Sequence, residues 1–440
     1  MPPGYKRTEV GVIPEDWDVV SLGELGAFMK GKGIKRDDVS HEGVPCIRYG
    51  ELYTCYDNYV CSPESHIPKS FAATSLPLKT GDLLFAGSGE TVEEIGKCVA
   101  YLGKEEAYAG GDIVVLRPLK QNSLFLGHLL NHAIVAQQKA RYGQGDAVVH
   151  ISARNLAMIK LPLPSQINEQ DVIAQALSDV DGLLGALDAL IAKKRAIKQA
   201  AMQQLLTGKT RLPGFNEEWE TKRLADYMRF LKTGSNSRSE LNTDGPVAYL
   251  HYGDIHMNDA VRLNSNNTPV PRIASERVRL LDRLQVGDLV FVDASEDLSG
   301  VGKSVEIESI PEGGMVAGLH TIGARFDKTI LADGFKAYLQ FCPEVLNTLK
   351  RLAAGTKVLA TNRQHIANIE MALPCVKEQT AIAAALSDMD AEIKALEQRR
   401  NKTQQIKQGM MQQLLTGRVR LMPQKTQVLE GPEKPSKGKI

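Results

Sequence analysis

The chain has 440 residues, which is more than one ordinary hydrophobic core holds and fits two domains of about 100 to 200 residues with connecting elements. Its content of 43% hydrophobic and 24% charged residues is ordinary for a soluble globular protein, and no apolar run approaches the roughly 18 residues of a membrane span. A net charge of +1 excludes a generally basic surface, so any surface that binds nucleic acid must be a local patch.

The N-terminus and the cysteines narrow the protein class further. The N-terminus is polar and lacks the apolar core of a secretory signal, so we predict a cytoplasmic location without a membrane. No CxxC pair is present, which argues against a zinc ribbon and a disulfide scaffold. The spacing of Cys55, Cys61 and His66 matches no standard ligand pattern, so we predict no metal. We expect reduced, structural thiols at all six cysteines: Cys46, Cys55, Cys61, Cys98, Cys342 and Cys375.

The first globular part, residues 1–165, is predicted to be mixed α and β. Short β-rich runs such as 83–86 and 113–116 are separated by Gly, Asp and Pro. A helix is predicted over 125–142, and a further strand then leads to Pro164, which ends the domain.

A long amphipathic helix is predicted over about 167–206, where the hydrophobic period changes. At about 1.5 Å per residue, it forms a rod of roughly 60 Å, and Gly208 is its expected C-terminal stop. The segment 166–210 is therefore a helical spacer. Its apolar residues have the spacing of a heptad seam and are Ile173, Leu177, Val180, Leu184, Leu187 and Ile191.

The second half of the chain repeats the first. MQQLLTGKTRL at 202–212 recurs as MQQLLTGRVRL at 411–421, an offset of 209 residues. EDWDVVSLGEL around Trp17 matches EEWETKRLADY around Trp219, and IRYGEL, LKTGDLLF and a Gly-Lys pair also have counterparts. The globular parts differ much more than the helical segments do. Something therefore constrains the helical segments equally in both copies.

The repeat completes the predicted organisation. A second globular domain covers 211–375, a second helical spacer covers 376–421, and the Lys-, Pro- and Gly-rich tail 422–440 is predicted to be disordered. The fold class is α+β, with two similar mixed α/β domains separated by two long helices. The second seam consists of Ile382, Leu386, Met389, Ile393 and Leu396.

Two interpretations of the seams remain open. Each helix could pack on its own domain, or the two helices could bury their seams on each other, which we prefer because one chain carries two copies of the same rod. The heptads continue less well in the second halves of the helices. Polar residues fall on the seam there, namely Lys194, Lys198, Arg400, Thr403 and Lys407.

Two glycine-rich motifs resemble cofactor loops. FAGSG at 85–89 is like the loop that holds S-adenosylmethionine in adenine methyltransferases, but the second copy reads FVDAS at 291–295, and no NPPY-like tetrapeptide follows. SGVGKS at 299–304 ends like a phosphate-binding loop, but the first glycine of that motif falls on Asp297. We also find no catalytic constellation that recurs between the copies, so neither motif predicts an activity.

Taken as a set, these motifs resemble the specificity subunits of type I restriction-modification systems. The resemblance covers about 5–421. It is carried by the two LLTG segments, the helices that open with Glu-Gln at 169 and 378, the similar segments around Trp17 and Trp219, and the GDLLF and GDLVF runs.

The resemblance implies a non-catalytic DNA-reading adaptor. Each globular part would be a target recognition domain for one half of a bipartite, asymmetric double-stranded DNA site, and the two helices would pair as an antiparallel coiled coil that fixes the gap. Two methyltransferase subunits would bring S-adenosylmethionine and adenine chemistry, and translocating nuclease subunits would bring ATP and Mg chemistry. No cofactor is expected on this chain itself.

Reading DNA requires hydrogen-bonding groups at base edges and cations at phosphates. The predicted DNA-binding residues of the first domain are Lys30, Lys32, Lys35, Arg36, Arg48, Tyr49, Ser88, Glu90 and Lys97. Those of the second domain are Lys232, Ser235, Asn236, Arg238, His251, Tyr252, Ser295, Glu296 and Lys303. Tyr49 and Tyr252 could instead be core residues.

Two alternative functions remain. A stand-alone adenine methyltransferase would bind S-adenosylmethionine as an isolated chain. A coiled-coil scaffold with two accessory domains would show no sequence preference for duplex DNA even with its partners.

Overall fold

The computed structural model describes residues 2–40, 42–145, 147–295, 300–353 and 359–421. The chain divides into two compact units: unit 1 is 1–187 with 399–440, and unit 2 is 188–398. The division runs through the two long helices, so each unit contains one globular domain and a part of each helix. The domain boundaries given above stay predictions. The predicted disorder of 422–440 lies outside the described residues.

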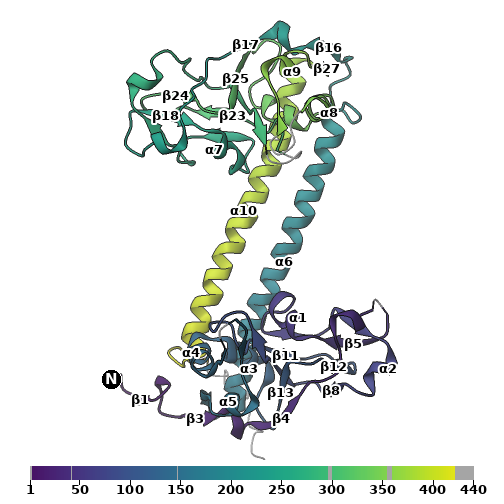
Figure 1. Cartoon of the computed structure of the whole chain (residues 1–440), viewed down its shortest axis with the longest axis vertical. Coiled ribbons are helices and arrows are strands. Elements are labelled where there is room, and N and C mark those ends of the chain that lie inside the picture. The colour runs from purple at the N-terminus through teal and green to yellow at the C-terminus, as the bar shows by residue number, and fades with distance from the viewer. Residues whose placement is uncertain (1, 41, 146, 296–299, 354–358, 422–440) are drawn as a thin grey trace, which may run out of the picture. The chain divides into compact units, whose positions relative to one another are not determined.

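The globular domain of unit 1 is built on two mixed sheets (Figure 1). The five-stranded sheet has the order β4 (Gly26–Lys30), β13 (Ile113–Pro118), β9 (Leu83–Ala86), β11 (Cys98–Tyr101) and β6 (Tyr59–Val60). The four-stranded sheet has the order β7 (Ser65–Ile67), β5 (Val44–Ile47), β12 (Ala107–Ala109) and β8 (Leu76–Leu78). The two β-rich runs predicted from the sequence are β9 and the first part of β13.

Shorter elements complete this domain. Its strand pairs are β1 (Tyr5–Thr8) with β2 (Gly11–Pro14), β3 (Trp17–Ser21) with β15 (Lys160–Pro164), and β10 (Ser88–Gly89) with β14 (Val149–His150). Its short helices are η1 (Leu22–Glu24), η2 (Arg36–Asp38), α1 (Tyr49–Thr54), α2 (Lys69–Ala72), α3 (Ser123–Asn131), α4 (Ala133–Tyr142) and α5 (Ala153–Ala157).

The single helix predicted over 125–142 is wrong, because the chain forms α3 and α4 there. His132 separates them with an extended backbone, at φ −69° and ψ 147°, and its ring accepts a hydrogen bond from the N–H of Ile134 as an N-cap. The side-chain amide of Asn131 holds the break by donating to Asn58 Oδ1 and to the carbonyl of Cys98. A tertiary contact therefore overrides a continuous helical pattern.

The globular domain of unit 2 has the same plan. Its five-stranded sheet has the order β17 (Met228–Phe230), β25 (Thr321–Phe326), β21 (Leu289–Val292), β23 (Ser304–Ser309) and β19 (Arg262–Asn264). A second sheet contains β20 (Arg272–Ile273), β18 (Val247–Leu250) and β24 (Met315–Ala317). The pairs are β16 (Glu220–Arg223) with β27 (Glu370–Leu373), and β22 (Ala294–Ser295) with β26 (Leu359–Ala360). The helices are η3 (Leu224–Tyr227), η4 (Arg238–Glu240), α7 (Tyr252–His256), η5 (Ser275–Val278), η6 (Lys336–Phe341), α8 (Pro343–Leu352) and α9 (Arg363–Ala367).

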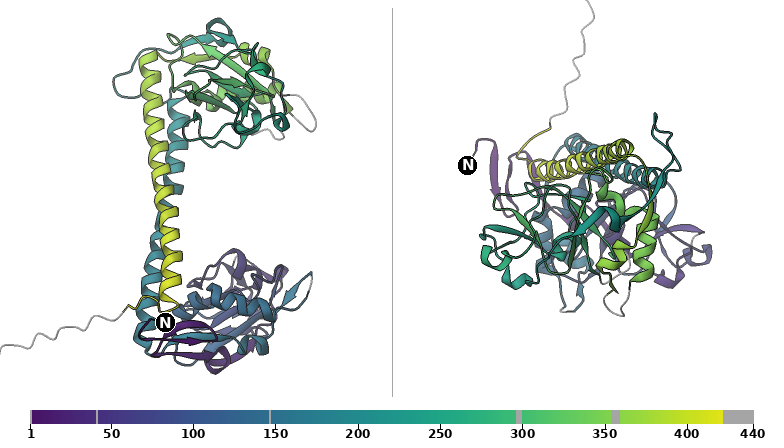
Figure 2. Two further views of the ribbon diagram at one scale, coloured as in Figure 1. Left: turned by 90° about the vertical axis from the view of Figure 1, so that its left-hand side faces the viewer. Right: turned by 90° about the horizontal axis from the view of Figure 1, so that it is seen from above.

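The two long helices are α6 (Ile167–Leu205) and α10 (Val376–Leu414), so the predicted fold class is confirmed. Within each unit their segments lie side by side and run antiparallel (Figure 1, Figure 2). In unit 1 the pair Asp181–Lys407 joins them, with Nζ and Oδ1 2.5 Å apart. In unit 2 Lys198 pairs with Asp390. These two ion pairs are equivalent under the 209-residue offset, so lysines on the seam are matched by aspartates of the facing helix.

The predicted seam residues face inward. Ile173 and Leu177 belong to the core of unit 1 together with Leu414, the last residue of α10, and Leu415 directly after it, so both interpretations of the stripe hold at this end. Buried seam residues are Ile173, Leu177, Leu184, Leu187, Ile191, Ile382, Leu386 and Ile393, whereas Val180, Met389 and Leu396 are half-buried.

In each unit the motifs of the repeat meet in one place, which we call the tryptophan joint. The joint of unit 1 consists of Trp17, Glu169, Gly417 and Arg420, and that of unit 2 consists of Trp219, Glu378, Gly208 and Arg211. In both joints the indole N–H donates to the glutamate, at 3.3 Å, and the arginine stacks over the indole, at 5.9 Å in unit 1 and 5.6 Å in unit 2.

The glycine of each joint has a backbone that favours glycine, with φ of +69° at Gly417 and +67° at Gly208. Each also lies against its tryptophan, because a Cβ on Gly417 would meet the Trp17 ring at 3.2 Å and a Cβ on Gly208 would meet the Trp219 ring at 3.3 Å. The LLTG segment is therefore both a helix stop and a packing surface, which explains why it is so similar in the two copies.

The cysteines in the structure are free thiols; Cys46, Cys98 and Cys342 are buried, and Cys55, Cys61 and Cys375 are exposed. Burial raises the pKa of the Cys46 and Cys98 thiols to about 12. In the described part of the chain, no helix is long and apolar enough to span a membrane, and no group of three or more His, Cys, Asp or Glu side chains could hold a metal ion.

Candidate nucleic-acid interface

Four loops meet at one end of the globular domain of unit 1. The loop after β4 is attached by the N–H of Gly31, which donates to the carbonyl of Ile113 at 2.8 Å. The N–H of Gly110 donates to the carbonyl of Ile47, beside α1, and the N–H of Gly87 donates to the carbonyl of Asp112 at 2.7 Å. The loops after β4, β5 and β9 and the turn before β13 therefore form one surface.

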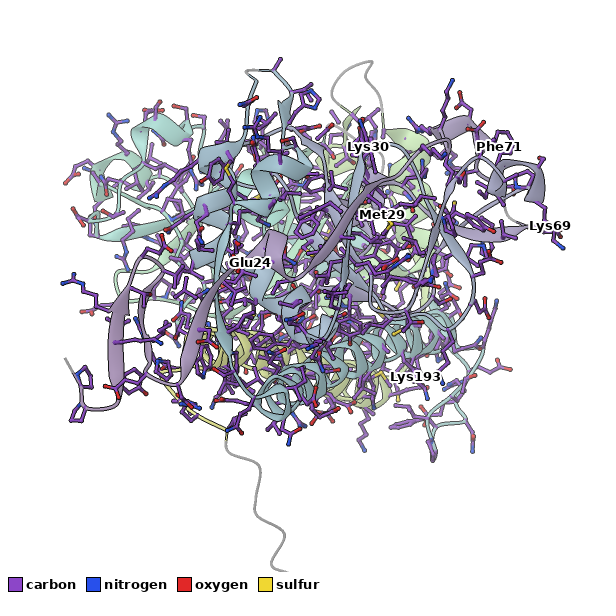
Figure 3. The ribbon with its side chains drawn as sticks, turned by 90° about the horizontal axis from the view of Figure 1, so that it is seen from below. Glu24, Met29, Lys30, Lys69, Phe71 and Lys193 are labelled. Carbon is purple, nitrogen blue, oxygen red and sulfur yellow. The ribbon has the colours of Figure 1, made fainter. Side chains whose placement is uncertain are left out.

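The predicted basic residues of the first loop lie on this surface. Lys30, Lys32, Lys35 and Arg36 are exposed, and Figure 3 shows Lys30 beside Met29 at the far end of β4 from Glu24. η2 holds the loop because the Asp38 carboxylate accepts a hydrogen bond from the Lys35 N–H at 2.7 Å. These four cations can approach a phosphate backbone without breaking a buried contact.

The residues around α1 divide into exposed and structural ones. Tyr49 is 42% exposed and so is not a core residue, and Glu90 is also exposed. Arg48, in contrast, pairs with buried Glu51 through Nη2, 2.7 Å away, which fixes the start of α1. Ser88 is buried, and its Oγ lies 3.0 Å from His150 Nδ1.

The repeated Gly-Lys pair has a structural role in both domains. Lys97 Nζ donates to the carbonyl of Tyr56 at 2.7 Å, and Lys303 Nζ donates to the carbonyl of His256 at 2.8 Å. Lys303 thus binds the last carbonyl of α7, where the helix leaves acceptors unpaired. Lys97 binds a carbonyl just after α1 and also reaches that of Tyr53 in α1, at 3.4 Å. Burial lowers the pKa of Lys97. The predicted DNA contacts of Lys97 and Lys303 therefore compete with a structural hydrogen bond.

The same four loops meet in unit 2. The N–H of Gly234 donates to the carbonyl of Ala317, and the N–H of Gly318 donates to that of Leu250, each at 2.9 Å. The N–H of Asp293 donates to the carbonyl of His320 at 3.2 Å. Backbone contacts of the interface are thus shared between the domains, whereas its side chains differ.

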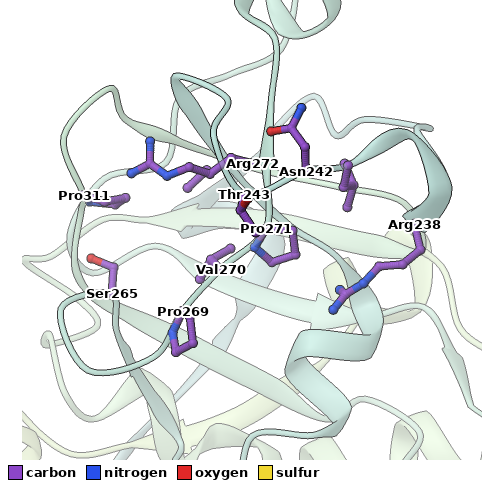
Figure 4. A pocket seen from close by; sticks show the side chains of 11 residues that line it. Arg238, Asn242, Thr243, Ser265, Pro269, Val270, Pro271, Arg272 and Pro311 are labelled. Atoms are coloured by element: carbon purple, nitrogen blue, oxygen red, sulfur yellow. The ribbon is translucent and has the colours of Figure 1, made fainter.

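The loop after β17 carries Lys232 and Ser235, which are exposed, and Asn236, which is half-buried. Arg238 is 58% exposed and pairs with Asp254 on α7 at 2.5 Å. An open pocket of about 620 Å³ adjoins it, and Figure 4 shows Arg238 and Arg272 on either side of Pro271. This surface combines an exposed guanidinium, which is paired with Asp254, with an apolar floor.

An aromatic cluster of Tyr252, His251, His256 and His320 lies beside this loop. The ring of Tyr252 lies 4.5 Å from that of His251, 6.0 Å from His256 and 5.4 Å from His320, measured between centroids. His251 is buried and caps α7 through the N–H of Gly253, and burial lowers its pKa. Tyr252 is half-buried. His251 is thus mainly structural, Tyr252 packs partly against the core, and His320 is 50% exposed.

Two predicted DNA-binding residues of the second domain lie where the described part of the chain is interrupted after residue 295. Ser295 is buried in β22, which pairs with β26, and Glu296 lies outside the described residues. Sequence reasoning missed His256, His320 and Asp293 in this region. Asp293 and Gly87 occupy equivalent positions in the repeat, so the change from glycine to aspartate is the signal in the sequence that marks this region.

The FAGSG motif has a packing explanation. A Cβ on Gly87 would lie 2.8 Å from the carbonyl oxygen of Asp112, so glycine permits the close approach of these two loops. Ser88 and Gly89 then form β10. The glycines therefore shape the interface itself.

Comparison with known proteins places the chain near one family. Residues 14–194 match the family described as type I restriction modification DNA specificity domain. The chain is 25% identical to a protein of Methanocaldococcus jannaschii named "Putative type I restriction enzyme MjaX specificity subunit", over 95% of this chain and 97% of that protein. It is 23% identical to the MjaVIII specificity subunit of the same organism, over 93% and 94% of the two chains.

Solved structures show the same fold. The type I restriction-modification S subunit from M. genitalium superposes with a TM-score of 0.57 and 13% identity, over 94% of this chain and 99% of that one. A chain from a structural study of complex assembly and conformational transition of the type I R-M system gives 0.56 and 15%, over 92% and 99%. The predicted resemblance to the specificity subunits of type I restriction-modification systems is confirmed by the family match, by these relatives and by the shared fold.

Proposed function

We propose that this chain is the DNA-reading subunit of a type I restriction-modification complex, in which each globular domain binds one half of a bipartite, asymmetric site. The observation that carries the proposal is the pair of interfaces built from the same four loops with different side chains. Two domains with the same backbone arrangement and different side chains can each recognise a different DNA sequence, which is what two different half-sites require.

The long helices would set the separation of the half-sites and dock two methyltransferase subunits. The charge pairs Asp181–Lys407 and Lys198–Asp390 support a fixed register between α6 and α10. A fixed register favours a constant spacer between the two bound DNA segments, because a one-turn slip would place Lys407 and Lys198 away from their partners.

The chain would act without catalysing a reaction. S-adenosylmethionine for adenine methylation, and ATP and Mg for translocation and cleavage, would bind to the partner subunits, and none of them to this chain. The named specificity subunits among its relatives support this division of labour.

The test is methylome sequencing of a host that expresses this chain with its methyltransferase subunit, against a host with the methyltransferase alone. We expect a bipartite methyladenine motif only when this chain is present. S-adenosylmethionine binding by the isolated chain would instead support the stand-alone methyltransferase, and a stable complex without a motif would support the scaffold.

A loop variant tests the cations of the first domain, and domain exchanges assign the half-sites. Replacement of Lys32 and Lys35 by glutamine in the first domain should weaken methylation at all sites. A replacement of the first domain by that of a relative should change one half of the motif only. The matched exchange of the second domain should change the other half, and a change of both halves by either exchange would contradict the two-reader model.

A further inference from the structure

Two non-glycine residues of the described chain have a left-handed backbone, Asp112 with φ +58° and His320 with φ +55°. They occupy equivalent positions, since Asp112 directly precedes β13 and His320 directly precedes β25. Each lies on the turn that contributes to its DNA-binding candidate surface. A side chain on such a backbone is strained, and a strained residue is a reason to look for a function.

The backbone role of this turn does not call for a side chain. The carbonyl of Asp112 accepts the N–H of Gly87, and the carbonyl of His320 accepts the N–H of Asp293. Glycine would adopt the same conformation without strain and would offer the same carbonyl. The imidazole of His320 is therefore not explained by the fold.

The imidazole is held in a defined orientation. Its Nδ1 lies 3.1 Å from Asp293 Oδ1, and its ring meets that of Tyr252 edge to face. A carboxylate oxygen accepts in this hydrogen bond, so the proton between the two groups lies on Nδ1, and in the tautomer that this bond selects Nε2 is an acceptor. The side chain of His320 remains 50% exposed in this arrangement. The first domain has glycine at the position of Asp293 and so lacks this fixed pair.

We infer that His320, oriented by Asp293 and Tyr252, is a specificity-determining residue of the second domain. This inference rests on the proposed DNA-reading function. An acceptor at Nε2 fits an exocyclic amino group at a base edge of the major groove, which only adenine and cytosine present. His320 therefore reads one adenine or cytosine of the second half-site.

The test compares His320→Asn and His320→Gly with the unchanged chain, each reconstituted with the methyltransferase subunit. Both residues tolerate a left-handed backbone, so the thermal midpoint of the complex should not fall. Methylome sequencing should show relaxed preference at one position of the second half-site. Competition binding with single-base variants of the site should show discrimination at that position reduced by about tenfold or more.

Asp112→Gly is the matched control, because it removes the equivalent strain in the first domain and should leave the second half-site unchanged. Full discrimination at every position of the second half-site in both His320 variants would overturn the inference. If a variant complex does not methylate, the competition experiment decides the question. Failure of the proposed function is distinguishable, because the unchanged chain would then produce no bipartite motif.

Discussion

Arg420 forms a two-pronged ion pair with Glu169, which lies 251 residues earlier in the chain. The second prong, from Nη2 to Oε2, is 2.8 Å long, and the same guanidinium also binds Asp16 at 2.8 Å. Arg211 binds Glu378 in the same way in unit 2, with both distances 2.6 Å. Both glutamates are buried, so each depends on its arginine for charge compensation.

Arg420→Ala should therefore destabilise unit 1 by about 3 to 5 kcal/mol, because it leaves the buried carboxylate of Glu169 unpaired. Hydrogen exchange of the β3 and β15 amides measures the effect. Arg211→Ala should act on β16 and β27 instead. Arg195→Ala is the control, because the exposed pair Arg195–Glu397 is worth less than about 1 kcal/mol. Equal effects of all three substitutions would contradict the special role of the joints.

Lys407→Leu should also be strongly destabilising, whereas Asp181→Leu with Lys407→Leu should be close to neutral. Lys407 and Asp181 are largely buried, so removal of one leaves an uncompensated charge, and removal of both leaves an apolar contact. A double-mutant cycle by chemical denaturation measures the coupling. Additive losses would show that the two side chains do not interact.

The stability of unit 1 should fall as the pH falls from about 6.5 towards 4, through His128. Burial, and then the positive charge of Lys407, lower the pKa of His128 to about 4, and no hydrogen-bond partner of its ring nitrogens is found among the described residues. A lowered histidine pKa means that the unfolded chain takes up the proton first, so stability is complete above the unfolded pKa and is lost below it. The loss amounts to at most about 3 kcal/mol.

His128→Leu isolates this contribution when thermal midpoints of both proteins are followed between pH 7.5 and 4. Burial raises the pKa of Asp181, which contributes with the opposite sign, so the difference between the two proteins is the relevant quantity. As the pH falls towards 4, the thermal midpoint of the leucine variant should rise relative to that of the unchanged chain. Parallel curves would exclude a role for His128.

Lys32→Ala should reduce DNA affinity, whereas Lys97→Ala should reduce thermal stability. Lys32 is exposed, so its loss should reduce DNA affinity uniformly across sequences and lower the slope of affinity against salt by about one. Lys97 holds the end of α1, so its loss should lower the thermal midpoint of unit 1. Fluorescence anisotropy of labelled duplex DNA with the reconstituted complex, together with thermal unfolding, separates the two effects. A normal midpoint for Lys97→Ala would remove the structural assignment.

The fold could be predicted because its strongest signals are periodic or repeated. The heptad spacing located α6 and α10. Short β-rich runs between turn residues located β9 and β13. The break at His132 could not be predicted, because it depends on Asn131 reaching Asn58 and Cys98, which are distant in the sequence. Local pattern competes there with a tertiary hydrogen bond.

The interface could be predicted only in part. Exposed cations such as Lys32 and Arg36 are visible as a charged, glycine-rich loop. Lys97 has the same residue type, but its role depends on the carbonyl of Tyr56, which the sequence does not place nearby. His320 could not be predicted, because the evidence for it is its left-handed backbone and its hydrogen bond with Asp293, and neither is visible in the sequence.

The tryptophan joints also fix an order of assembly during synthesis. The joint of unit 2 is complete once Glu378 has followed Arg211 out of the ribosome, whereas Glu169 must wait for Arg420, near the end of the described chain. The domain that is made first is thus the last to be secured. A polypeptide terminated shortly before residue 420 would keep its second domain secured and lose the anchoring of its first.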